Sequence, residues 1–218
     1  MGEKKQLQKE KLEVIKGRII IDRFNREKSR LTLGPNESLT IFLLPSLTNK
    51  NKTLDVYLQG DGSHVKILGA TVGSGASRSN LNINIIHQGL STSAYTHVRS
   101  VLFDDSFSYF SGLIKIEKGA NKTSSLLENR VLILGEGARS ESAPQLEIEA
   151  DDVRASHAAT TGQLDKTQLF YLQSRGIEEA TATRMLIEGF FEPVLGRLPS
   201  EETAAEIRGE LWTDILRR

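Results

Sequence analysis

Short apolar and alternating runs recur from Ile19 to about Val153, and this pattern constrains the fold more than any other feature. In Leu81–Ile86 the apolar residues alternate with asparagines, as in a strand with one buried face. Hairpin turns of the Asn-Gly or Asp-Gly type are scarce, with Asp61-Gly62 as the candidate. Regularly spaced strands are typical of a sandwich or a β-solenoid, and the scarcity of tight hairpins favours the solenoid. The runs are Ile19–Ile21, Leu39–Leu44, Leu54–Leu58, Val65–Leu68, Leu81–Ile86, Val98–Phe103, Leu113–Ile116, Val131–Leu134 and Leu146–Ile148.

After Asp165 the apolar spacing changes from that of strands to that of helices. Asp165 with Gln168 three residues later predicts a capped helix start, and Gly176 predicts its end. A second amphipathic stripe runs over 182–190, and Pro193 is expected to stop that helix. Two helices are therefore predicted between Asp165 and Pro193.

A third helix is predicted from Ser200, a typical N-cap residue, to the arginines at 217 and 218, which suit its C-terminus. Three short amphipathic helices bury little by themselves, so we expect them to pack on the β body or on another protein. The predicted organisation is a charged leader over residues 1–17, a β body over 18–160 and a helical subdomain over 161–218.

Composition excludes several classes of protein. The chain has 28 Lys and Arg and 28 Asp and Glu, so it lacks the basic field of a nucleic-acid-binding protein. No apolar run approaches the roughly 20 residues that cross a bilayer, and the start has no signal-peptide core. We therefore expect a cytoplasmic protein without a membrane partner. There is no cysteine, which excludes disulfides and thiolate ligands from this chain.

Several motifs in the second half resemble the C-terminal core of the SufB/SufD family of iron–sulfur cluster assembly scaffolds. They are PQLEI, ADDV, SHAATTGQLD and LFYLQSRGI, in this order from Pro144 to Ile177. The similarity is strong from about Leu126 to Gly196 and mainly architectural before it. Typical members are longer and carry an N-terminal region that this sequence lacks. The resemblance implies a mainly β protein, a right-handed parallel β-helix with a C-terminal three-helix subdomain.

His157 is the candidate residue for cluster assembly. In the SufD-like pattern the matching histidine lies at the interface between two scaffold subunits, and imidazole binds iron or moves a proton near neutral pH. Ala155 stands where SufD-type members commonly carry cysteine. A hydrogen-bonded histidine at a strand end is the alternative interpretation. His64, His87 and His97 are widely spaced, and we expect ordinary structural roles for them.

The resemblance also implies partners. The family's C-terminal helices dock a SufC-type ABC ATPase, and the candidate docking residues are Phe170, Tyr171, Arg175, Gly189 and Phe190. The second implied partner is a SufB-type scaffold or another copy of this chain. We expect no cofactor or metal in the isolated chain, and a transient iron–sulfur cluster only in a complex.

The favoured function is thus a non-catalytic, short SufD-like scaffold or accessory subunit. One alternative is a carbohydrate-active enzyme on a β-helix, which would need carboxylates clustered in a groove. Another is a homologue that has lost cluster chemistry and serves as an interaction module, an alternative that the absence of cysteine supports.

Overall fold

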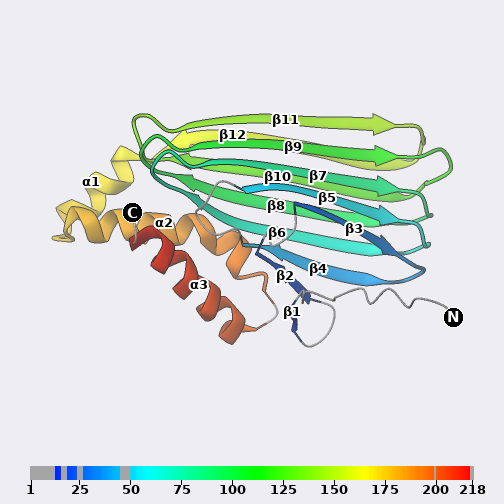
Figure 1. Cartoon of the computed structure of the whole chain (residues 1–218), viewed down its shortest axis with the longest axis horizontal. Coiled ribbons are helices and arrows are strands. Elements are labelled where there is room, and N and C mark those ends of the chain that lie inside the picture. The colour runs from blue at the N-terminus through cyan, green and yellow to red at the C-terminus, as the bar shows by residue number, and fades with distance from the viewer. Residues whose placement is uncertain (1–12, 16–18, 24–26, 45–49, 199, 217–218) are drawn as a thin grey trace, which may run out of the picture.

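The computed structural model describes residues 13–15, 19–23, 27–44, 50–198 and 200–216. Strands follow one another alternately in two facing sheets, and three helices lie at one side (Figure 1). The seven-stranded sheet has the order β1 (Glu13–Ile15), β2 (Ile19–Asp22), β4 (Ser38–Leu43), β6 (His64–Gly73), β8 (Ser93–Leu102), β10 (Thr123–Ile133) and β12 (Val153–Gln163). The five-stranded sheet has the order β11 (Arg139–Ile148), β9 (Phe107–Ile116), β7 (Arg78–His87), β5 (Lys50–Leu58) and β3 (Lys28–Leu33).

All strand pairs are parallel except β1 with β2. Parallel neighbours that belong to successive windings of the chain define a β-solenoid, which confirms the predicted fold. The winding length varies. His64 pairs with Ser93, which is 29 residues later, and Ser93 pairs with Ser124, 31 residues further on. This variation explains why the sequence shows no strict repeat.

One corner of the solenoid is built from a stack of left-handed residues. Asn36, Gly62, Ser91 and Lys122 have φ angles of 54°, 69°, 54° and 58°. The Gly62 amide donates to the Leu90 carbonyl at 2.8 Å, and the Ser91 amide donates to the Asn121 carbonyl at 2.9 Å. These bonds join each corner to the next winding and offset the strain at the non-glycine positions. Asp61-Gly62 is therefore a corner of a winding and not a hairpin turn.

The sheets enclose an interior core, to which inward-facing residues of both sheets contribute, among them Ile67, Ile83, Phe110 and Leu127. A second core, which we call the outer core, lies between the outside of the seven-stranded sheet and the helices. The second half of β4 and the middle of β6 are thus buried on both faces, and both stretches are consecutive apolar or small residues.

Helices α2 (Glu179–Leu195) and α3 (Glu201–Leu216) cover the outer face of the seven-stranded sheet, whereas α1 (Lys166–Ser174) buries no residue. Figure 1 shows α1 beyond the end of the β body. The Asp165 cap is confirmed, because its carboxylate accepts from the amides of Thr167 and Gln168. The expected stop at Pro193 is wrong: α2 continues to Leu195, with Pro193 inside its last turn.

Three strands were missing from the sequence interpretation, namely β1, β3 and β12. Strand β3 has few apolar residues, and β12 is rich in alanine and threonine, so neither shows the expected alternation. The predicted leader lies largely outside the described residues, apart from β1 at Glu13–Ile15. No helix in the described part of the chain is long and apolar enough to cross a membrane.

Candidate functional site

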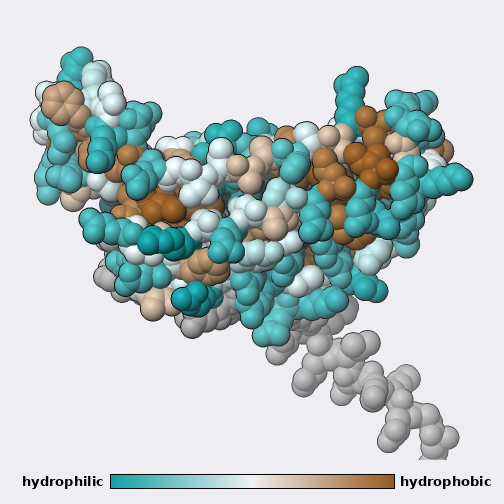
Figure 2. Space-filling view, turned by 90° about the horizontal axis from the view of Figure 1, so that it is seen from above, coloured by the Kyte–Doolittle hydropathy of each residue, from teal (hydrophilic) through white to brown (hydrophobic). Residues whose placement is uncertain are grey.

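The last winding of the solenoid, formed by β11 and β12, is open on one side. Both strands are edge strands of their sheets, and no described element covers them. Leu146 and Ile148 occupy interior-facing positions, in register with the buried Ile114 and Ile116, yet they are 37% and 45% exposed. Figure 2, which looks onto this end, shows hydrophobic side chains in two areas, a larger one on the right and another on the left. Interior positions that are left exposed form an apolar surface of the kind found at protein–protein contacts.

His157 lies on this open winding, within β12 and not after the last strand as the sequence suggested. It is in register with Leu127 of β10, which in turn pairs with Thr96 of β8, and both of these are buried in the solenoid. His157 therefore continues an interior column at the point where the column reaches the surface. Its side chain is exposed and has no hydrogen-bond partner among the described residues. Ala155, two residues earlier, packs against the interior core.

The two open edges differ in their ability to pair. Strand β11 contains Pro144, which lacks an amide proton, and the stretch 140–152 contains five acidic residues and no basic one. Proline and charge are devices that discourage pairing at a sheet edge. Strand β12 has neither in its central part, where small uncharged residues flank His157. Of the two edges, β12 is the one suited to backbone pairing with another chain.

The predicted docking residues fall into two groups. Phe170 and Tyr171 on α1 are 70% and 57% exposed, and the Arg175 guanidinium lies 5.4 Å from the Tyr171 ring centre. Gly189 of α2 has open space at its α-carbon. Phe190, by contrast, is half-buried and contacts Phe191 and Arg99. The exposed group on α1 is the part available to a partner.

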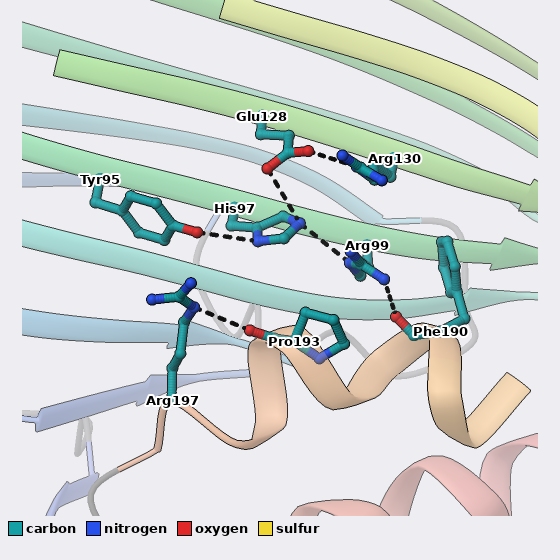
Figure 3. A network of polar contacts seen from close by, with 8 residues as sticks. All are labelled: Tyr95, His97, Arg99, Glu128, Arg130, Phe190, Pro193 and Arg197. Atoms are coloured by element: carbon teal, nitrogen blue, oxygen red, sulfur yellow. Dashed lines mark hydrogen bonds and ion pairs between the residues drawn. The ribbon is translucent and has the colours of Figure 1, made fainter.

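A larger polar cluster escaped the sequence interpretation. Tyr95, His97 and Arg99 alternate along β8 and meet Glu128 and Arg130 of β10, and Arg99 and Arg197 both reach α2. Figure 3 shows these side chains converging between the sheet and the helix, and we call them the His97 network. The Tyr-x-His-x-Arg spacing on one strand face was the only sequence signal.

The described residues contain no group of three or more His, Cys, Asp or Glu that could by itself hold a metal ion. His87 is fully buried, and its Nδ1 lies 2.8 Å from the Thr92 hydroxyl. Burial lowers the pKa of His87 to about 4. His64 lies beside the Ser93 hydroxyl at 2.7 Å, and burial followed by the charge of Lys66 lowers its pKa.

Residues 37–190 match the family described as SUF system FeS cluster assembly, SufBD core domain. Among curated proteins, the iron–sulfur cluster assembly protein SufD of Bacillus subtilis is 43% identical over 144 residues, which is 66% of this chain and 33% of the relative. SufD of Escherichia coli is 40% identical over 104 residues, 48% of this chain and 24% of the relative. A SufBD family protein of Mycobacterium leprae is 30% identical over 146 residues, 67% of this chain and 17% of the relative. The chain thus spans about a third or less of these relatives.

Proposed function

Because this chain belongs to the SufBD family of iron–sulfur cluster assembly proteins, we propose that it is a non-catalytic, SufD-like scaffold or accessory subunit. The observation that carries this proposal is the open last winding, which exposes interior residues and an unprotected edge strand beside His157. An uncovered solenoid end favours a second subunit, since pairing satisfies its free amides and carbonyls.

The partner at this end is a SufB-type scaffold in preference to another copy of this chain. A two-fold self-pairing would bring two acidic β11 edges together, each with Glu141 and Glu147 on the strand and Glu149 directly after it, and like charges opposed across strands are unfavourable. Lys115 offsets part of this charge, since its Nζ lies 3.5 Å from Glu147 and 3.7 Å from Glu149. A different chain with a basic edge would avoid the repulsion.

At such an interface, His157 would supply one ligand to a cluster that is assembled as cargo. The chain has no cysteine, so thiolate ligands would come from the partner. An exposed imidazole with no intramolecular partner is free to bind iron or to move a proton. The neighbouring alanines would let the partner backbone approach closely.

The SufC-type ATPase would dock on α1. This helix buries no residue, yet it presents Phe170 and Tyr171 with an arginine stacked beside them. Aromatic residues with an arginine nearby are typical of the residues that dominate binding energy in protein interfaces. Phe190 would affect ATPase docking only indirectly, because it helps to hold α2 on the sheet.

The alternative of an interaction module without cluster chemistry shares both interfaces and differs in whether iron is bound. Family membership favours either form of scaffold over a carbohydrate-active enzyme.

Co-expression with a SufB-type scaffold and a SufC-type ATPase, followed by anaerobic purification, tests the proposal. We expect all three chains to co-elute and His157→Ala to lower the iron and sulfide content without changing the co-elution. Thr161→Ala, on the same side of β12, is the control. Co-elution without iron in the wild type would support the interaction module, and failure to co-elute would refute both forms of the proposal.

The double variant Phe170→Ala/Tyr171→Ala tests the docking helix separately. We expect it to lose the ATPase and to keep the scaffold partner. Leu90→Ala, at an exposed residue on a corner of the solenoid, is the matched control. Retention of the ATPase by the double variant would show that α1 is not the docking site.

A further inference from the structure

Arg99 connects the seven-stranded sheet to helix α2. From β8, its Nη1 donates a hydrogen bond to the Phe190 carbonyl, and its guanidinium lies 5.0 Å from the centre of the Phe190 ring (Figure 3). Arg197, just after α2, makes a second connection: its guanidinium lies 4.9 Å from the Tyr95 ring centre, and its Nε donates to the Pro193 carbonyl at 3.1 Å. These polar contacts therefore add to the apolar contacts through which α2 packs on the sheet.

His97 orients Arg99, and this contact defines the position of the imidazole proton. The Arg99 Nε–H donates to His97 Nε2 at 3.0 Å. A guanidinium is always a donor, so Nε2 must be unprotonated and the ring proton must be on Nδ1. Nδ1 lies 3.3 Å from the Tyr95 hydroxyl oxygen, which accepts a hydrogen bond from the Nδ1–H group. His97 is therefore neutral in this arrangement.

The surroundings keep His97 neutral. Burial is the main cause that lowers its pKa to about 4, and the nearby charges of Arg99, Arg130 and Arg197 add to it. Glu128 acts in the opposite direction, with its Oε2 at 3.5 Å from Nε2. On the side of β8 away from β10, the residue in register with His97 is Leu68 of β6, which is apolar and carries no charge.

We propose that His97 and Arg99 form a latch that holds α2 on the solenoid while Nε2 of His97 is unprotonated and releases it when Nε2 takes up a proton. A proton on Nε2 would place two donors against each other and break the bond from Arg99. The new N–H would instead donate to Glu128, which is the only carboxylate in the network. Arg99 would then lose the group that aims it at Phe190.

Protonation of His97 would also affect the open last winding of the solenoid. Glu128 and Arg130 are joined by an ion pair, and on β12 they are in register with Ala158 and Thr160, next to His157. A proton that draws Glu128 toward His97 alters this pair, one strand away from the open edge. The latch is a property of the chain alone, whichever partners the helices and the edge bind.

Hydrogen–deuterium exchange of the full chain between pH 7 and pH 4 tests the latch. Rates are expressed as protection factors, and α2 is compared with β6 in the same sample. Loss of one charge-assisted hydrogen bond corresponds to about a tenfold change in opening. We expect the protection of α2 relative to β6 to fall by about that factor as the pH approaches 4.

Two variants separate the latch from general acid unfolding. His97→Gln keeps an acceptor for Arg99 and does not titrate, so the ratio of α2 to β6 protection should stay constant with pH. His87→Gln removes another buried histidine, in the interior core, and should leave the pH dependence of the ratio unchanged. Arg99→Met should lower α2 protection about tenfold already at pH 7.

A constant ratio in the wild type, or a ratio that falls equally in His97→Gln, would overturn the latch. If Arg99→Met fails to fold, the comparison of wild type with His97→Gln still decides. Emission of Trp212, the single tryptophan, which lies 4.5 Å from the Arg184 guanidinium of α2, gives a second readout of the same movement.

Discussion

Arg23 and Glu210 form a two-pronged ion pair across 187 residues of sequence. The Arg23 Nη2 lies 2.6 Å from Glu210 Oε1, and its Nε lies 3.2 Å from Oε2. This contact attaches α3 beside β2, at the first windings of the solenoid. The same helix buries Ile207 and Leu211 in the outer core, together with Phe42 and Leu44 from the end of β4. The C-terminal helices therefore fold back onto the N-terminal windings.

This arrangement predicts a measurable contribution from the pair. Glu210→Gln should lower the free energy of unfolding by about 1 kcal/mol, the upper range for a partly exposed ion pair. Glu188→Gln breaks the more exposed Arg184–Glu188 pair on α2 and should cost about half as much or less. Urea unfolding of both variants makes the comparison, and equal effects would contradict a special role for Arg23–Glu210.

Two phenylalanines of the helical subdomain should respond differently to truncation. Phe191 is 2% exposed in the outer core, so Phe191→Ala should destabilise the protein by about 3–5 kcal/mol. Phe170 is exposed on α1, and Phe170→Ala should change stability by less than about 0.5 kcal/mol. Thermal melts test both. A large loss in Phe170→Ala would mean that α1 packs on the body after all.

A buried lysine should be important at the first windings. The Lys52 ammonium lies 2.6 Å from Asp22 Oδ2 and 2.7 Å from the Ser29 hydroxyl, and Lys52 is among the largest fully buried side chains. Lys52→Met should lower the free energy of unfolding by about 2 kcal/mol, because the Asp22 carboxylate loses the charge of the lysine and the Ser29 hydroxyl loses a donor. Adding Asp22→Asn should recover part of the loss. If the single variant is as stable as wild type in urea, the ion pair contributes little.

Stability should depend on pH through His87 and His97. Both have a pKa lowered to about 4 in the folded chain, compared with about 6.5 when unfolded. The unfolded state therefore binds protons first, so stability is full above about pH 6.5 and falls as the pH drops toward 4. Each pKa unit corresponds to about 1.4 kcal/mol.

Chemical unfolding at pH 7.5, 6 and 5 measures this loss. His97→Gln should reduce the slope between pH 6.5 and 4. Thr161→Ala, at an exposed and non-titrating position on β12, is the control and should not alter it. An unchanged slope in His97→Gln would show that His97 is not the titrating group.

The sequence was informative about elements whose signals are local. Asp165 caps its helix, Ser200 accepts from the Thr203 amide at 3.1 Å, and most predicted strands exist, because caps and period-2 runs depend on near neighbours. It failed for β12, whose small residues give no alternation. That strand is held by its register with β10 across a whole winding. Pro193 was misread because the helix can continue for two residues beyond it.

Some residues of the candidate site could also be recognised from the sequence, and others could not. The motif around His157 and the exposed aromatic residues of α1 were recognisable from sequence, since they are contiguous. The His97 network was not, because Arg99 and Phe190 are 91 positions apart in the sequence and meet only after the chain has completed the solenoid and returned as α2. The sequence by itself determined the helix caps and the absence of thiolates, and it favoured the solenoid over a sandwich, to which the family resemblance added. Only the tertiary structure decided which histidine is buried and which reaches the open edge, because burial depends on what the next winding and the returning helices cover.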